Sequence, residues 1–142
     1  MPYEYLDHTA DVGLRGIGST LAEALTEGAL GLFGLMVDPK RVEPRREVLI
    51  ECSAGDPAGL FVQLLNELLA QQDLEGLLFG YFAISSLRQT ADGYELRGVA
   101  RGEAMDLARH QPQAEVKAAT YGGLDYHIDR NGQHVLQCIL DL

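Results

Sequence analysis

The stretch that decides the fold is "PAGLFVQLLNELLAQQ", from Pro57 to Gln72. Its large apolar side chains recur three and four positions apart, which is the spacing of one helix face; they are Leu60, Phe61, Leu64, Leu65, Leu68 and Leu69. Asp56 stands where an N-cap is expected, and Pro57 suits the first helical position. No long heptad run indicates a coiled coil. The stretch therefore predicts a helix that packs on a sheet, with Gln63 and Asn66 on the side away from the apolar stripe.

A second helix is predicted upstream, from Leu21 to about Val37. Thr20 and Glu23 have the spacing of a capping box, and Pro39 ends the helical pattern. Three glycines lie inside this helix at intervals of three, at positions 28, 31 and 34. Two interpretations stay open: another backbone approaches the helix closely there, or the helix is locally weak and burial offsets the weakness.

Strands are predicted for the remaining apolar and alternating segments, roughly residues 3–6, 12–18, 47–52, 78–89, 93–102, 114–121, 124–129 and 134–140. The pairs Asp92-Gly93 and Asn131-Gly132 are typical of tight hairpin turns. Because the helices come early and the strands follow consecutively, we expect an α+β fold. Its two helices pack on one face of a mainly antiparallel or mixed β-sheet, in a single compact domain that spans residues 1–142.

The composition of the chain argues against several functional classes, among them nucleic-acid-binding, membrane-spanning and secreted proteins. The chain has 142 residues and a formal net charge of −10, which disfavours direct nucleic-acid binding through phosphate contacts. No apolar run approaches the roughly 20 residues of a membrane span, and no signal peptide is visible, so a cytoplasmic protein is expected. Cys52 and Cys138 match no metal or redox spacing, and we interpret them as free thiols.

Motifs for covalent catalysis and nucleotide binding are absent from the sequence. There is no G-x-S-x-G nucleophile motif. "GLRGIG", from Gly13 to Gly18, lacks the glycine order of a dinucleotide loop. No two histidines have the four-residue helical spacing of a zinc site.

The carboxylates indicate a functional site more clearly than the serine, glycine and histidine patterns do. In "YLDHTADVGLRG", Asp7, His8 and Asp11 cluster just before a predicted strand, and Asp141 ends the apolar strand "LQCILDL". If Asp11 and Asp141 converge, their oxygens and the terminal carboxylate of Leu142 would form a site of hard oxygen ligands, which suits calcium or magnesium better than zinc. Solvated strand ends are the alternative that the pattern leaves open.

One basic side chain, that of Lys117, is a further candidate for a functional residue. Lys117 lies in "AEVKAATY", where strand alternation would place it on the same face as Glu115 and Ala119. It is predicted either to pair with a nearby aspartate or to face solvent on a half-exposed sheet.

Several segments, taken together and in order, resemble the archease family. They are "DHTADVG" near the N-terminus, "LLNELL" in the second predicted helix, "GE" followed by "D" and "RH" between Gly102 and His110, "EVKAATY" and the final "LDL". The resemblance covers essentially the whole chain.

The resemblance implies an accessory protein rather than an enzyme. Archeases assist the RtcB-type RNA-splicing ligase: they promote its guanylylation, support multiple turnover and broaden its use of nucleoside triphosphates in tRNA splicing. The family's metal ligands map to Asp11, Asp141 and Leu142. Asp7 and His8 become supporting residues, and Lys117 becomes a functional candidate.

The ion that the resemblance implies is divalent, with calcium expected and magnesium or manganese as alternatives. This chain departs from the family at Gly122, where a histidine is usual after "TY", and in having no tryptophan before the "LNELL" segment. Two other functions stay open. One is a chaperone-like or protein-binding module with a purely structural metal, and the other is a stand-alone metal-dependent hydrolase.

Overall fold

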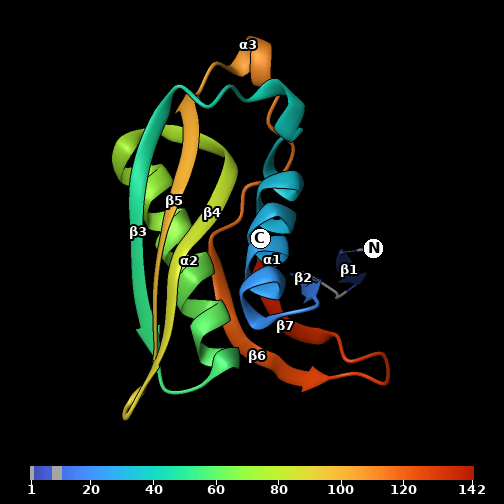
Figure 1. Cartoon of the computed structure of the whole chain (residues 1–142). Helices are drawn as coiled ribbons and strands as arrows, with labels where there is room; N and C mark the ends of the chain where they lie inside the picture. The colour runs from blue at the N-terminus through green and yellow to red at the C-terminus, as the bar shows by residue number, and fades with distance from the viewer. Residues whose placement is uncertain (1, 8–10) are drawn as a thin grey trace.

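Two helices lie between two antiparallel sheets in the computed structural model, which describes residues 2–7 and 11–142 (Figure 1). The strands are β1 (Tyr3–Asp7), β2 (Asp11–Gly18), β3 (Arg46–Ala54), β4 (Leu77–Thr90), β5 (Gly93–Ala104), β6 (Ala118–Ile128) and β7 (His134–Asp141). The helices are α1 (Leu21–Met36), the 3-10 turn η1 (Pro39–Arg41), α2 (Pro57–Glu75) and the single turn α3 (Leu107–His110). None of the helices in the described ranges combines the length and apolarity needed to cross a membrane.

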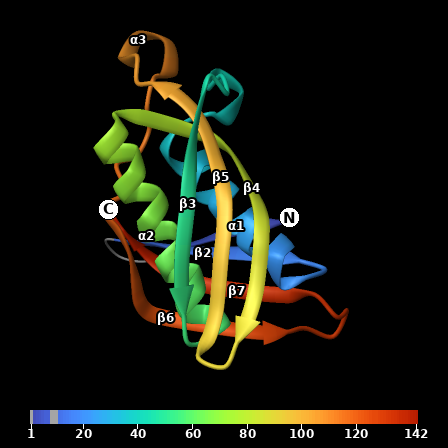
Figure 2. The ribbon, with the colours of Figure 1, turned by 60° about the vertical axis from the view of Figure 1, so that its left-hand side comes forward.

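The predicted α+β class is confirmed, with one difference in how the strands are distributed. They form two sheets instead of one: β1-β2-β7-β6 and β3-β5-β4. Every strand pair is antiparallel. α1 packs on β2 and β4, while α2 packs on β3 and β6, so the helices cover one face of each sheet (Figure 1). Strands of the two sheets cross instead of running alongside one another (Figure 2).

Local capping explains where the two long helices begin. The Thr20 side chain accepts a hydrogen bond from the Glu23 N–H at 3.1 Å, and the Asp56 side chain accepts one from Gly59 at 2.7 Å. The second half of the predicted capping box is displaced by one residue, because Glu23 Oε2 accepts from the Ser19 N–H and hydroxyl. α2 ends at Gly76, whose φ of 67° is the left-handed conformation that favours glycine.

The glycines of α1 let neighbouring elements approach the helix closely. Of the two interpretations that the sequence left open, the close approach is therefore the one that holds. A Cβ on Gly28 would collide with the Phe61 ring of α2, and a Cβ on Gly16 of β2 would collide with the α1 backbone at Ala24. Gly31 lies under Tyr3 and Leu14. The missing side chains therefore let α1 seat deeply against β2 and α2, around a core that contains the fully buried Phe61.

Both predicted hairpins are confirmed. Thr90 pairs with Gly93 in the β4–β5 hairpin, and Ile128 pairs with His134 in the β6–β7 hairpin. In the second loop, Gly132 has a φ of 76°.

Candidate functional site

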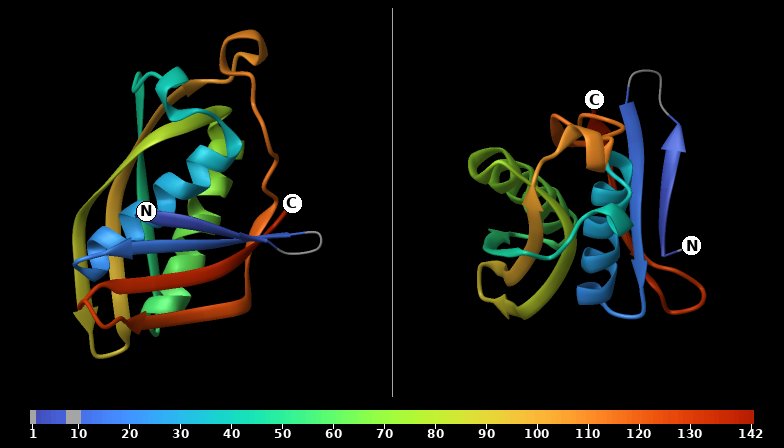
Figure 3. Two further views of the ribbon diagram at one scale, coloured as in Figure 1. Left: turned by 90° about the vertical axis from the view of Figure 1, so that its right-hand side faces the viewer. Right: turned by 90° about the horizontal axis from the view of Figure 1, so that it is seen from above.

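Asp11 and Asp141 come together through strand register. Asp11 is the first residue of β2 and Asp141 the last residue of β7, and the antiparallel ladder pairs them directly. Directly paired residues share one face of a sheet, with Cβ atoms about 4.5–5.5 Å apart. The end of β7 lies beside the start of β2 in the side view (Figure 3). The sheet therefore places two carboxylates next to each other.

The alternation of β7 decides which face carries them. Leu136, Cys138 and Leu140 are fully buried toward the helices. Asp141 is consequently on the outer face, where it is exposed, and Asp11 is half-buried. Asp141 ends a strand in the interior of its sheet, because β7 lies between β2 and β6.

Neither carboxylate has a hydrogen-bond or ion-pair partner among the described side chains. Like charges directly opposite one another destabilise a sheet, and a bound cation would remove that repulsion. Carboxylate oxygens are hard ligands suited to calcium or magnesium. The donor chemistry of Asp11 and Asp141 therefore fits a divalent ion.

Two aspartates alone do not complete an ion's coordination. Within residues 2–7 and 11–142, no group of three or more histidine, cysteine, aspartate or glutamate side chains is placed to hold a metal. Leu142, the third ligand that the family resemblance implies, directly follows Asp141. Asp7 pairs with Val12 rather than with Asp11 in the β1–β2 ladder. His8 lies outside the described residues.

Lys117 reaches the aspartate pair through its backbone. Its N–H donates to the Asp141 carbonyl at 2.8 Å, and the next residue, Ala118, begins β6 as the ladder partner of Asp141. The predicted strand placement of Lys117 is wrong, because β6 starts one residue later. The Lys117 side chain is exposed whereas Ala119 is buried, so the two do not share a face. No ion pair of the Lys117 side chain occurs among the described residues.

Asn66 of α2 holds the beginning of β6, a role that the sequence analysis missed. Its side-chain Oδ1 accepts from the Ala119 N–H at 2.8 Å, and its Nδ2 donates to the Ala119 carbonyl at 3.0 Å. The prediction that Asn66 points away from the packed side of α2 is therefore wrong. Gln63, one turn earlier, donates from Nε2 to the Tyr121 hydroxyl at 2.8 Å. These contacts fix the strand that follows Lys117.

A buried acid, Glu103 at the end of β5, is the second feature the sequence analysis did not single out. Its Oε2 accepts from the Glu43 N–H at 2.8 Å and lies 3.0 Å from His110 Nε2. The Arg109 guanidinium contacts the same oxygen, and Arg45 Nε is 3.4 Å from Oε1. The Glu43 N–H first, then His110 and Arg109, lower the pKa of Glu103 to about 2.

This acid anchors the segment that carries α3. His110 is 1% exposed, and its Nδ1 accepts from the Asp106 N–H at 2.9 Å. The Nε2 atom therefore carries the proton and donates it to Glu103. Asp106 caps α3 by accepting from the Ala108 and Arg109 N–H groups. Glu103 of "GE" and the Arg109-His110 pair of "RH" thus form one structural clamp. In the sequence, an acid at a strand end followed closely by two basic residues was the pattern that could have indicated this clamp.

The cysteines are poor candidates for nucleophiles. Cys138 is buried and Cys52 half-buried, and both are free thiols. Burial raises the pKa of each thiol to about 12. Because the thiolate is the reactive form, neither group is activated at neutral pH.

Comparison with known proteins identifies the family. The model of the archease protein family matches residues 3–142. The archease of Thermococcus gammatolerans is 42% identical over 140 residues, which cover 99% of this chain and 98% of that protein. The archease of Methanopyrus kandleri is 38% identical over the full length of both chains.

A solved structure agrees with the fold. The solution structure of protein 1598 from Methanobacterium thermoautotrophicum superposes with a TM-score of 0.83 at 30% identity, covering 99% of each chain. The full-length sequence matches and the shared fold lead to one conclusion. This chain belongs to the archease family.

Proposed function

We propose that this protein is an accessory activator of an RtcB-type RNA ligase in tRNA splicing. It promotes guanylylation of the ligase, supports multiple turnover and broadens the range of nucleoside triphosphates that the ligase accepts. The observation that carries the proposal is the direct pairing of Asp11 with Asp141 in a chain of this family. The two thiols have raised pKa values, which is consistent with an accessory role in which the ligase performs the covalent chemistry.

Asp11 and Asp141 would hold a divalent ion, calcium first and magnesium or manganese as alternatives. The carboxylate of Leu142 would complete the ligand set, with Asp7 and His8 in support. A divalent ion bound there would offset phosphate charge during ligase guanylylation. Lys117, one residue before the strand that pairs with Asp141, adds positive charge near this end of the sheet.

A guanylylation assay at limiting ligase tests the proposal. Purified wild-type protein should increase both the rate of guanylylation and the number of ligation turnovers. Asp11→Asn should abolish most of that stimulation, because it removes a ligand charge with little change in shape. Asp92→Asn is the matched control, since Asp92 is an exposed carboxylate in the β4–β5 turn. No stimulation by the wild-type protein would refute the function.

The alternative function, a protein-binding module with a purely structural ion, predicts a different order of events. Asp141→Asn would then lower the melting temperature in calcium, and ligase stimulation would fall only as the protein unfolds. Full stimulation by a folded Asp141→Asn variant would favour this alternative over the proposed role.

A further inference from the structure

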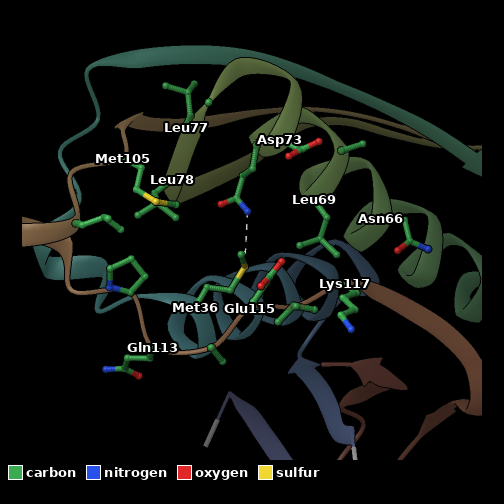
Figure 4. A pocket seen from close by; sticks show the side chains of 17 residues that line it. Met36, Asn66, Leu69, Asp73, Leu77, Leu78, Met105, Gln113, Glu115 and Lys117 are labelled. Atoms are coloured by element: carbon green, nitrogen blue, oxygen red, sulfur yellow. Dashed lines mark hydrogen bonds between the residues drawn. The ribbon is translucent and has the colours of Figure 1, made fainter.

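A cavity lies beside the C-terminal half of α2, and Lys117 at one end of it adjoins the aspartate pair. Its volume is about 870 Å³, and it is open along one side between α2, the end of α1 and the segment 105–117 (Figure 4). Met36, Leu69, Leu78 and Met105 supply an apolar lining. Methionine side chains adapt to differently shaped apolar partners. At the mouth, Leu107 remains 71% exposed and Met105 49% exposed.

A buried amide faces this cavity. Gln72 is 7% exposed, and its Oε1 accepts from the Phe79 N–H at 2.9 Å. Its Nε2 has a thioether as its acceptor, Met36 Sδ at 3.6 Å, marked by the dashed line in Figure 4. Sulfur is a weak acceptor, and no stronger acceptor for this amide occurs among the described residues. The cavity floor therefore presents a donor that suits a carbonyl oxygen.

One wall of the cavity is extended backbone held at two points. The Gln113 N–H donates to the Met36 carbonyl at 2.8 Å, and the Lys117 N–H donates to the Asp141 carbonyl at 2.8 Å. Between these anchors, residues 114–116 make no backbone hydrogen bond to any other described residue. Such a stretch offers N–H and C=O groups to an added strand, as sheet edges do in peptide recognition.

Charge at the rim indicates what kind of segment would enter. Asp73 and Glu115 are exposed lining residues without an ion-pair partner in the described part of the chain. Lys117 is the one basic residue among the described lining residues, and it lies at the end nearest Asp141. The chain as a whole carries a net charge of −10. A nucleic acid would meet repulsion here, whereas a basic polypeptide would be attracted.

We propose that this groove binds an extended segment of the partner ligase that combines an apolar anchor with flanking lysine or arginine. The anchor fills the space between the methionines and Leu69, a carbonyl of the segment accepts from Gln72, and the basic side chains face Asp73 and Glu115. The identity of the partner rests on the proposed function, but the residues that would contact the segment, among them Leu69, Asp73 and Glu115, do not include Asp11 or Asp141. Binding and stimulation are therefore separable.

The test measures affinity and maximal stimulation for the same variants. Leu107→Glu and Asp73→Arg change exposed side chains in the groove, so the fold should be retained. Each should raise the Kd for the purified ligase at least about tenfold, because a tenfold change corresponds to about 1.4 kcal/mol, the scale of one good interface contact. At saturating concentration, stimulation should equal that of the wild type. Asp11→Asn should do the opposite and keep its affinity while losing stimulation.

Two controls and a mapping experiment complete the design. Leu49→Glu, at a 58% exposed position on β3, and Asp92→Arg should leave the Kd unchanged. A photoreactive residue placed at position 107 should cross-link to a ligase peptide that contains apolar and basic residues. Wild-type affinity in both groove variants, or cross-linking to an acidic peptide, would overturn the groove proposal while leaving the proposed function intact. Absence of any stimulation by the wild type would overturn the function, and with it the ligase as occupant.

Discussion

Asp11 and Asp141 stand directly opposite each other in the β2–β7 ladder, although they belong to the second and the last strand of the chain. Two adjacent carboxylates repel, and a bound divalent ion would turn that repulsion into attraction. The pair would thus destabilise the sheet in the absence of an ion, and under the proposed function it would bind one.

This relationship predicts opposite effects of Asp11→Asn with and without calcium. In chelator, the variant should be as stable as the wild type or more stable by about 0.2–1 kcal/mol, because one like-charge pair is removed. In calcium, the wild type should gain about 2.7 kcal/mol at roughly 100 times the Kd, and the variant should gain little. Thermal unfolding in the two buffers measures both effects. An equal calcium response in Asp11→Asn and Asp92→Asn would contradict an ion site at Asp11.

Asn66 should be required to hold the start of β6. Asn66→Asp keeps the shape but replaces the N–H donor by a second acceptor facing the Ala119 carbonyl, so about 1–3 kcal/mol of unfolding free energy should be lost. Urea titration measures this loss, and hydrogen exchange at Ala119 should accelerate. Gln63→Glu is the matched control, because Gln63 is exposed and bonds only a side chain; it should cost less than about 0.5 kcal/mol. Equal costs for the two variants would rule out a special role for Asn66.

Glu103 should make the protein lose stability in a defined acid range. Its pKa is lowered from 4.5 to about 2, so the stabilisation is fully present above the unfolded value and is lost as the pH falls from about 5 toward 2. Glu103→Gln should therefore lower the melting temperature at pH 7. The difference from the wild type should shrink steadily as the pH drops through that range.

Calorimetry at pH 7, 4 and 3 checks this prediction. Glu95→Gln serves as the control, because Glu95 forms an exposed ion pair with Arg88, and exposed pairs contribute little. A Glu103→Gln deficit that stays constant from pH 7 to pH 3 would show that the carboxylate's ionisation is not what stabilises the clamp.

The family histidine that is missing at Gly122 should be accommodated by this backbone. Gly122 is exposed, and a Cβ there would lie 3.7 Å from Thr120 Oγ1. Gly122→His should therefore change the unfolding free energy by less than about 0.5 kcal/mol. Gly123→His should be clearly destabilised, because Gly123 has a φ of 63° and its Cβ would lie 2.9 Å from Ile139 Cδ1. Chemical denaturation of the two variants would show equal losses if this reasoning were wrong.

Features set by neighbours in sequence were predictable. The caps at Thr20 and Asp56 depend on residues within three positions, and the hairpin turns near Asp92 and Asn131 depend on local backbone preferences. The burial stripe of α2 follows from helical periodicity alone. These features required no knowledge of what each element packs against.

Features set by tertiary contacts were missed. Residues 114–117 alternate like a strand, but hydrogen bonds to the distant Met36 and Asp141 carbonyls hold them outside the sheet. α3 is a single turn that exists because Asp106 caps it and His110 is held by Glu103. Asn66 looked solvent-facing because nothing local shows that β6 passes beside α2. Their positions at strand ends do not by themselves pair Asp11 with Asp141, because the shared register depends on the whole β2–β7 ladder.

That ladder also has a kinetic consequence. Among the strand pairs of the two sheets, β2 with β7 closes the longest loop, and non-local pairings of this kind form slowly. The aspartate pair is complete only once this closure has occurred, so partly folded or nascent chains lack it. Under the proposed function, the ligase would therefore respond only to fully folded molecules of this protein.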